Sequence, residues 1–233
     1  MTVLNPARLA PCSITNAFPV NDLFYRARTR LMCALLSRLH RTGTVTLGGL
    51  ELEVAQGVHH PAPVFGLGFT ALQEAAVAEL APRSRVLELG TGAGFWALTA
   101  ARAGHDVTGT ELPDVPLPGA TAQKLGLAVR LLHSDLFDAL PGETFDAVLF
   151  NPPFHDAEPR SPEERAWSGA TTVRRFLSQL PAHLTAQGRA FVLFPRADRE
   201  RYATELAAFD AHSVASQWFP LLGRVELLRL TPR

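Results

Sequence analysis

Two short segments combine residue types and spacing that suit ligand chemistry. In the first, VLELGTGAGFWAL at residues 86–98, an apolar strand runs into Gly90, Gly92 and Gly94 and then directly into a helix. Glycines let a chain turn tightly and let a ligand approach the backbone, and free amides at a helix start favour polar or anionic groups. Glu88, two residues before the first glycine, would repel a phosphate. The segment therefore predicts a loop for a positively charged or zwitterionic ligand.

The second segment is Asn151-Pro152-Pro153-Phe154, directly after the apolar strand FDAVLF. In an open parallel sheet the carboxyl ends of the strands are where ligands bind. The two prolines stiffen the chain at this point, and Phe154 offers a ring face on which a planar group can stack. The motif therefore predicts a rigid turn in contact with a planar ligand.

The elements that must position both segments alternate between strands and helices. This alternation predicts an α/β fold: a seven-stranded, mostly parallel, Rossmann-like sheet with helices on both faces. Only about four residues, 220–223, separate the last two strands, so the last strand is expected to be antiparallel. The expected strands are 85–89, 106–110, 129–133, 147–150, 190–194, 214–219 and 225–230, and the expected helices are 70–80, 95–103, 170–184 and 198–209.

The pattern divides the chain into an amino-terminal extension, residues 1–56, and a main domain, residues 57–233. Apolar residues recur every three or four positions over 21–41, which predicts an amphipathic helix. Residues 44–50 and 52–56 predict two short strands around Gly48 and Gly49, joined as a hairpin or interrupted by a bulge. Residues 1–50 hold six arginines and one aspartate, a net charge of +5. An arginine face can be an ordinary solvated surface or can dock on nucleic-acid phosphates, with Arg26 and Arg30 as candidate contacts.

Composition excludes several classes of function. The 233 residues carry 22 basic and 22 acidic side chains, and 47% of them are hydrophobic, which predicts a globular chain rather than a strongly charged or disordered one. No apolar stretch approaches the ~18 residues of a membrane span, and no secretory signal is recognisable. Two cysteines predict neither a disulfide framework nor a zinc site, and His59 and His60 lack a third ligand. We expect a cytoplasmic protein without a metal.

With an acidic residue, an apolar residue and then Gly90-x-Gly92-x-Gly94, the chain resembles the class I S-adenosylmethionine-dependent methyltransferases over about residues 55–230. The resemblance implies that Glu88 and the glycine loop with Thr91 face the methionine part of the cofactor. Glu111, at the end of the next strand, is implied to hold both ribose hydroxyls, since a carboxylate accepts two hydrogen bonds at once. Asp135 after the third strand, with Leu136 beside it, is implied to contact the adenine, and Asn151 to complete the cofactor site.

The NPPF motif resembles that of the small-domain methyltransferases that modify a planar nitrogen. The lone pair of such a nitrogen is delocalised, so the nitrogen attacks a methyl sulfonium poorly until its two hydrogens are held and it is turned toward the methyl group. The Asn151 side-chain carbonyl and the Pro152 backbone carbonyl can accept those hydrogens. Asn151, Pro152, Pro153 and Phe154 are therefore the candidate catalytic residues, and the methyl donor brings its own leaving group.

The extended motif NPPFH resembles ribosomal RNA guanine-N2 methyltransferases, which favours an exocyclic amino group of an RNA base as the acceptor. His155 and Trp167 are candidate contacts to that base. Alternatives are a protein glutamine amide, as in release-factor glutamine methyltransferases, or a small molecule. Two other classes stay open: a noncatalytic methyltransferase-like binding module and, with less support, a nicotinamide oxidoreductase, which the missing G-x-G-x-x-G spacing disfavours.

Overall fold

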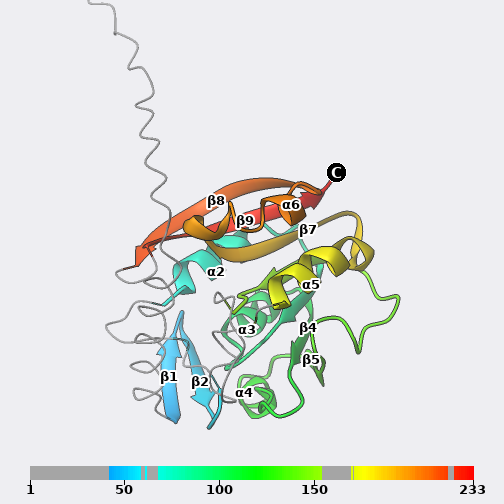
Figure 1. Ribbon diagram of the computed structural model, residues 1–233. Coiled ribbons are helices and arrows are strands. Elements are labelled where there is room, and N and C mark those ends of the chain that lie inside the picture. The colour runs from blue at the N-terminus through cyan, green and yellow to red at the C-terminus, as the bar shows by residue number, and fades with distance from the viewer. Residues whose placement is uncertain (1–41, 59–60, 62–67, 154–168, 170, 220–222) are drawn as a thin grey trace, which may run out of the picture.

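The computed structural model describes residues 42–58, 61, 68–153, 169, 171–219 and 223–233. In these residues a seven-stranded sheet carries helices, and a two-stranded hairpin lies beside helix α4 (Figure 1). The hairpin consists of β1 (Gly43–Leu47) and β2 (Leu50–Val54). The other strands are β3 (Arg85–Leu89), β4 (Asp106–Glu111), β5 (Val129–His133), β6 (Phe145–Phe150), β7 (Leu184–Pro195), β8 (Phe209–Phe219) and β9 (Gly223–Pro232). The helices are α2 (Thr70–Ala78), α3 (Phe95–Arg102), α4 (Gly119–Lys124), α5 (Thr172–Gln179) and α6 (Ala203–Leu206), with 3-10 turns η3 (Leu180–His183) and η4 (Arg196–Asp198).

The sheet has the order β5-β4-β3-β6-β7-β9-β8 and is parallel except for one strand. β3 pairs in parallel with β4 and β6, while β9 is antiparallel to both β7 and β8. The predicted α/β class, the seven strands and the antiparallel last strand are confirmed. Because all the other strands run in one direction, their carboxyl ends meet at a single edge of the sheet.

The central strands are apolar on both faces because helices cover both. On one face Leu87 and Val148 pack with Phe176 of α5, and all three are fully buried. On the other face Val86 packs with Trp96 of α3. This two-sided burial explains why β3 and β6 read as nearly continuous apolar runs in the sequence. It also holds the strand ends rigidly.

The amino-terminal hairpin turns at Gly48 and Gly49, which have φ values of 51° and 72°. A two-residue turn with two positive φ values matches the twist of its flanking strands, and glycine adopts it without steric cost. The predicted hairpin at these glycines is confirmed, although the predicted strand 44–50 extended through them. The structure instead ends β1 at Leu47, which pairs with Leu50.

Two predicted helices differ from the structure. The expected helix 170–184 is shorter, since α5 covers Thr172–Gln179 and passes into η3. The expected helix 198–209 was wrong in its extent: only Ala203–Leu206 is α-helical, and Phe209 already begins β8. Phe209 pairs with Pro232 of β9 and is buried in the core, so long-range strand pairing overrides local helical periodicity there.

The hairpin is packed onto the helices near the glycine loop. Leu50 and Leu52 are buried against Phe95 and Leu98 of α3 and Ala122 of α4. The hairpin therefore shares a core with the helix that follows the glycine loop. Among the described residues, no helix combines the length and apolar character needed to cross a membrane.

Replacement of Leu52 with Ala tests whether the hairpin belongs to the cooperative fold. Leu52 is completely buried, so we expect a loss of about 2–5 kcal/mol in the free energy of unfolding, measured by urea denaturation. Thr44→Ala, at an exposed position of β1, is the matched control and should change stability by less than about 0.5 kcal/mol. Equal stabilities of the two variants would contradict a shared core.

Candidate active site

Four neighbouring strands bring the predicted site residues to one edge of the sheet. Glu88 lies one residue before the end of β3, and Glu111 ends β4. Asp135 follows β5, and Asn151 follows β6. Because these strands are adjacent in the order β5-β4-β3-β6, four polar side chains that are far apart in sequence meet at one edge.

The glycine loop makes a tight reversal between β3 and α3. Gly90, Gly92 and Gly94 all have positive φ values, of 65°, 54° and 88°. Gly94 is also the residue before α3, and a Cβ there would approach Pro118 to 2.9 Å. The loop therefore needs glycine both for its backbone angles and for its packing.

Glu88 is a buried carboxyl that takes the place of a helix cap. Its Oε2 accepts a hydrogen bond of 2.8 Å from the backbone N–H of Ala97, and no side chain caps α3 at Gly94. Burial raises the pKa of Glu88 well above its usual value, and repulsion from Glu111 raises this pKa further, against the lowering effect of the Ala97 hydrogen bond. A cation bound beside these two carboxyls would offset both costs.

Glu111 is tied to the glycine loop by its side chain. Its Oε2 accepts the backbone N–H of Gly92 at 2.9 Å, and its Oε1 accepts the backbone N–H of Leu112 at 2.9 Å. Burial raises the pKa of this carboxyl, while the two backbone hydrogen bonds act in the opposite direction. An ionised carboxylate has about four acceptor sites, so each oxygen can accept one more donor, as a ligand with two hydroxyls requires.

Asp135 has a partner that the sequence did not indicate. Its Oδ2 accepts a hydrogen bond of 2.8 Å from Arg175 of α5, and Asp138 lies 3.8 Å from the same guanidinium. Leu136, next in the chain, has a φ of 52°, which is uncommon for a residue with a Cβ. Ser134 supports the turn, because its hydroxyl donates to the Leu136 carbonyl and accepts the Ala139 N–H.

Asn151 presents an acceptor without a donor. Its Oδ1 is buried and has no hydrogen-bond partner among the residues that the structure describes. Pro152 is buried, and Gly169 packs so closely on Pro153 that a Cβ at Gly169 would come within 2.9 Å of the proline ring. The loop is thus held rigid from two sides, with an unsatisfied carbonyl oxygen at its start.

Some predicted site residues lie outside the described part of the chain. These are Phe154, His155 and Trp167 after the prolines, and Arg26 and Arg30 of the amino-terminal segment. The expected helix 21–41 falls outside it as well. Their roles stay predictions.

Comparison with known proteins identifies the family. The family model described as "Methyltransferase small domain" matches residues 69–215. The chain belongs to this family. The resemblance to small-domain methyltransferases is therefore confirmed, and the family description gives the enzyme class, methyltransferase. Two solved structures of the same fold are described as complexes with AdoMet or SAH, the methyl donor that the sequence predicts and its product.

Two curated relatives have different acceptors in their names. Ribosomal RNA small subunit methyltransferase C of Alcanivorax borkumensis is 30% identical over 181 residues, which covers 72% of this chain and 52% of that protein. Release factor glutamine methyltransferase of Gloeobacter violaceus is 32% identical over 167 residues, covering 63% of this chain and 57% of that protein. The chain spans about half the length of the curated relatives it matches.

A solved structure shows the same fold. The 16S rRNA N2 G1207 methyltransferase of T. thermophilus, in complex with AdoMet and guanosine, has a TM-score of 0.57 and 23% identity. The alignment covers 83% of this chain and 50% of that protein. At this identity the likeness concerns the fold.

The residues present in this methyltransferase fit S-adenosylmethionine. The cofactor carries a sulfonium and an ammonium group, which suit the region of the buried Glu88 carboxyl, and two ribose hydroxyls, which suit the free acceptor sites of Glu111. Three contacts around the site were not predicted from the sequence. Arg175 binds Asp135, Gly169 packs on Pro153, and Val58 lies close to Gly92, where an added Cβ would be 3.8 Å from Val58 Cγ1. Their separation along the chain explains this, because no local pattern links them. Among the described residues, no three His, Cys, Asp or Glu side chains group closely enough to hold a metal ion.

Glu88→Gln tests the electrostatic role of the buried carboxyl. A raised pKa in the folded state means that stability is lost as pH rises from the unfolded pKa toward the folded one. We therefore expect Glu88→Gln to be more stable than the wild type at pH 8, with the difference shrinking toward pH 4.5, in urea denaturation. The same variant should bind S-adenosylmethionine less tightly, because the acceptor charge is lost.

Glu143→Gln is the matched control with the opposite sign. Glu143 accepts two hydrogen bonds from Arg130, of 2.7 Å and 2.9 Å. These hydrogen bonds are the main reason why the pKa of Glu143 is lowered. Its contribution is present at neutral pH and disappears as pH falls, so this variant should be the less stable one near pH 8. The same pH trend in both variants would contradict the assignment of Glu88.

Proposed function

We propose that this chain transfers a methyl group from S-adenosylmethionine to a planar nitrogen, namely an exocyclic amino group of a base in ribosomal RNA. The observation that carries the proposal is the buried and unpaired Oδ1 of Asn151 at the carboxyl end of β6. An acceptor that stays unpaired in a buried position costs free energy, unless a ligand supplies its donor. A planar amino group is a donor of this kind.

The position of Asn151 supports a direct role in the reaction. Asn151 follows β6, and β6 is paired with β3, the strand that leads into the glycine loop. The acceptor therefore lies beside the loop assigned to the methyl donor. S-adenosylmethionine, when bound, supplies an activated methyl group and its own leaving group.

The segment Asn151-Pro152-Pro153, called the NPP loop, holds and orients the acceptor nitrogen. The Asn151 side-chain carbonyl and the Pro152 backbone carbonyl hold the two hydrogens of the acceptor amine, which turns the nitrogen lone pair out of conjugation and toward the methyl group. The nitrogen would form the new N–C bond as the S–C bond of the donor breaks, and it would then lose one of its protons to solvent. The packing of Gly169 on Pro153 restricts the backbone of the segment that begins at Asn151. Phe154 and His155, which lie outside the described residues, are proposed to contact the planar substrate.

RNA is favoured over a protein substrate on two grounds. The curated ribosomal RNA relative aligns with 72% of this chain, against 63% for the glutamine relative from Gloeobacter. The sequence NPPFH and the arginines of residues 1–50 fit a nucleic acid as well. Because of these arginines, we also propose that residues 1–56 contribute to substrate docking. Residues 57–233 are then the proposed methyltransferase domain. The proposed place of action is the cytoplasm.

A glutamine amide is the second candidate acceptor. The release factor glutamine methyltransferase of Salmonella typhimurium is 42% identical to this chain over 123 residues, although these cover only 50% of the chain. An amide nitrogen is planar and needs the same acceptors as an amino group on a base. The Asn151 geometry therefore serves either substrate.

Asn151→Ala tests the mechanism. We expect kcat/KM for methyl transfer to unmodified ribosomal RNA to fall by about 100-fold or more, as when one transition-state hydrogen bond is removed from an enzyme. The resemblance also implied a cofactor contact for Asn151, but we assign its side-chain carbonyl to the substrate amine. The dissociation constant for S-adenosylmethionine should therefore change by less than about threefold. The assay measures tritium transferred from labelled cofactor.

The same assay with a second acceptor distinguishes the two substrates. A glutamine-containing release-factor peptide should gain no label from the wild-type enzyme at concentrations at which ribosomal RNA does. Label on the peptide alone would replace RNA with protein as the substrate. Full activity of Asn151→Ala on either acceptor would remove Asn151 from the mechanism.

A further inference from the structure

A group of charged and aromatic side chains lies at the same end of the sheet as Asn151. Phe150 of β6 pairs with Val192 of β7, so Asn151 lies beside the last residues of β7. The end of β7, Pro195, pairs in turn with Val225 at the start of β9. Strands are ~4.8 Å apart, so β9 is about 10 Å and β8 about 15 Å from the line of β6. The tip of the β8–β9 hairpin is therefore within reach of a substrate held at Asn151.

The side chains in this group share one face of the sheet. Residues directly opposite each other in an antiparallel pair point to the same side, and Trp218 is opposite Arg224. Ser216 is likewise opposite Glu226, and Arg224 Nη1 donates to the Ser216 hydroxyl at 3.3 Å. The hairpin thus presents a continuous row rather than scattered side chains.

Two arginines from the segment after β7 extend the row. Arg199 Nε lies 2.8 Å from Glu226 Oε2, and Arg196 Nη1 lies 3.7 Å from Glu226 Oε1. We call these six residues, Arg196, Arg199, Ser216, Trp218, Arg224 and Glu226, the hairpin patch. With three arginines and one glutamate it carries a net charge of +2.

Glu226 fixes the arginines without burying their charge. The glutamate side chain is 6% exposed, whereas those of Arg196 and Arg199 are 66% and 37% exposed. A guanidinium held from one side keeps its remaining donors directed at solvent, and less freedom is lost when it binds a second partner. The patch is therefore prepared for an anion.

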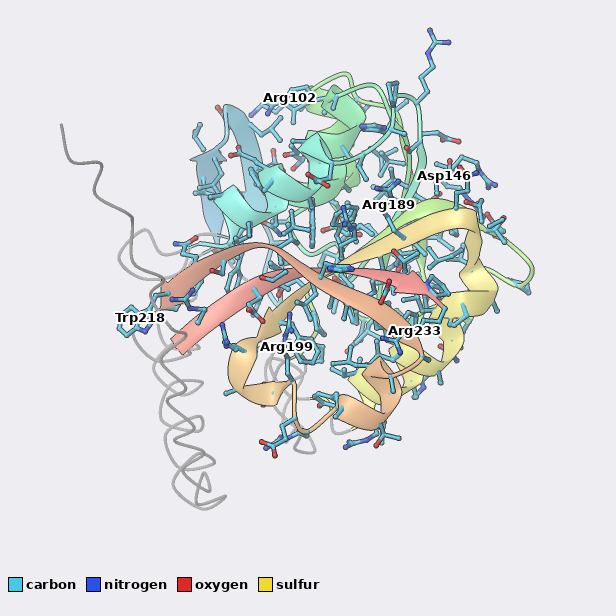
Figure 2. All side chains as sticks on the ribbon, turned by 90° about the horizontal axis from the view of Figure 1, so that it is seen from above. Arg102, Asp146, Arg189, Arg199, Trp218 and Arg233 are labelled. Carbon is cyan, nitrogen blue, oxygen red and sulfur yellow. The ribbon has the colours of Figure 1, made fainter. Side chains whose placement is uncertain are left out.

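Trp218 is the feature that an ordinary charged surface does not explain. It is the one large hydrophobic side chain among the described residues that is exposed, at 65%. Figure 2 shows it standing out from the end of the hairpin, whereas Arg199 lies beside the strands. Indole has a large flat face and one N–H donor, which suits stacking on a planar ring.

We propose that the hairpin patch binds a single-stranded segment of the RNA substrate next to the methylated base. The arginines contact its phosphates, and Trp218 stacks on an unpaired base. This inference rests on the proposed function, because it takes RNA as the substrate. Proteins that bind single strands combine a positive track along the backbone with aromatic side chains that stack on bases, which is the combination present here.

The surroundings of Trp218 favour RNA over a protein partner. Its neighbours in the patch are Arg224 and Ser216, which are polar, and no other large apolar side chain is exposed in the described part of the chain. The centre of a protein interface is normally an apolar cluster that is depleted in charge. A single indole among guanidinium groups does not form such a cluster.

Affinity for a fluorescein-labelled, single-stranded 20-nucleotide RNA, measured by anisotropy on the full chain, tests the patch. We expect Trp218→Ala to weaken binding by about 10-fold, as for the loss of one stacked base, and Trp218→Phe to restore most of it. The double variant Arg196→Ala/Arg224→Ala should lower the slope of log affinity against log salt by about 1.4, for two lost phosphate contacts.

The control variant removes the same charge from the opposite edge. Arg85 begins β3 and therefore lies at the opposite end of the parallel strands from Asn151. Arg233 follows the end of β9, and Figure 2 shows Arg233 at the other end of the β8–β9 hairpin from Trp218. In the double variant Arg85→Ala/Arg233→Ala the RNA affinity should stay within about twofold of the wild type. Its slope of log affinity against log salt should stay within about 0.3 of the wild-type slope. Calorimetry with S-adenosylmethionine verifies that every variant is folded, since none of these residues lies in the cofactor site.

The outcomes separate this inference from the proposed function. If RNA binding weakens in the patch variants and not in the control variant, the result supports the patch. If the wild type binds RNA and all variants bind it equally well, the patch is wrong while the proposed function stands. If the wild type binds cofactor but no RNA, both the RNA substrate and the patch are overturned, and binding of a protein substrate becomes the measurement to make.

Discussion

The reversal of the chain between β3 and α3 is the constraint on which the site depends. It requires positive φ values at Gly90, Gly92 and Gly94, and it brings the first amides of α3 back toward the strand that precedes them. This geometry allows the Glu88 carboxyl to reach the Ala97 N–H and the Glu111 carboxyl to reach the Gly92 N–H. Two acidic side chains are therefore fixed by backbone donors of one short segment.

The same arrangement explains how a buried acid becomes useful. Burial makes ionisation of Glu88 unfavourable, and the nearby Glu111 adds repulsion. A cationic cofactor removes this penalty when it binds, so part of the binding energy comes from relief of an existing electrostatic cost. Asn151 follows the same logic with hydrogen bonding, because its buried carbonyl gains a donor when the substrate amine arrives.

Much of this could be predicted from the sequence because the decisive signals are local. Apolar runs that end in glycine or proline located β3 and β6, and the acids at strand ends followed from them. The start of β8 was not predictable, because Phe209 is extended through pairing with Pro232. The Arg175–Asp135 contact joins residues 40 positions apart, and Gly169 packs on Pro153 although the two are not neighbours in sequence. Tertiary contacts of this kind leave no periodic trace.

Calorimetric binding of S-adenosylmethionine to the full chain tests the central claim, that the glycine loop and its two acids form the cofactor site. The account predicts micromolar binding that Glu111→Ala weakens by about 10-fold or more, because the ribose hydroxyls lose a charged acceptor. Glu111→Gln should retain part of the affinity, as a check that the loop still folds. Absence of binding in the wild type, or equal binding in Glu111→Ala, would contradict the account.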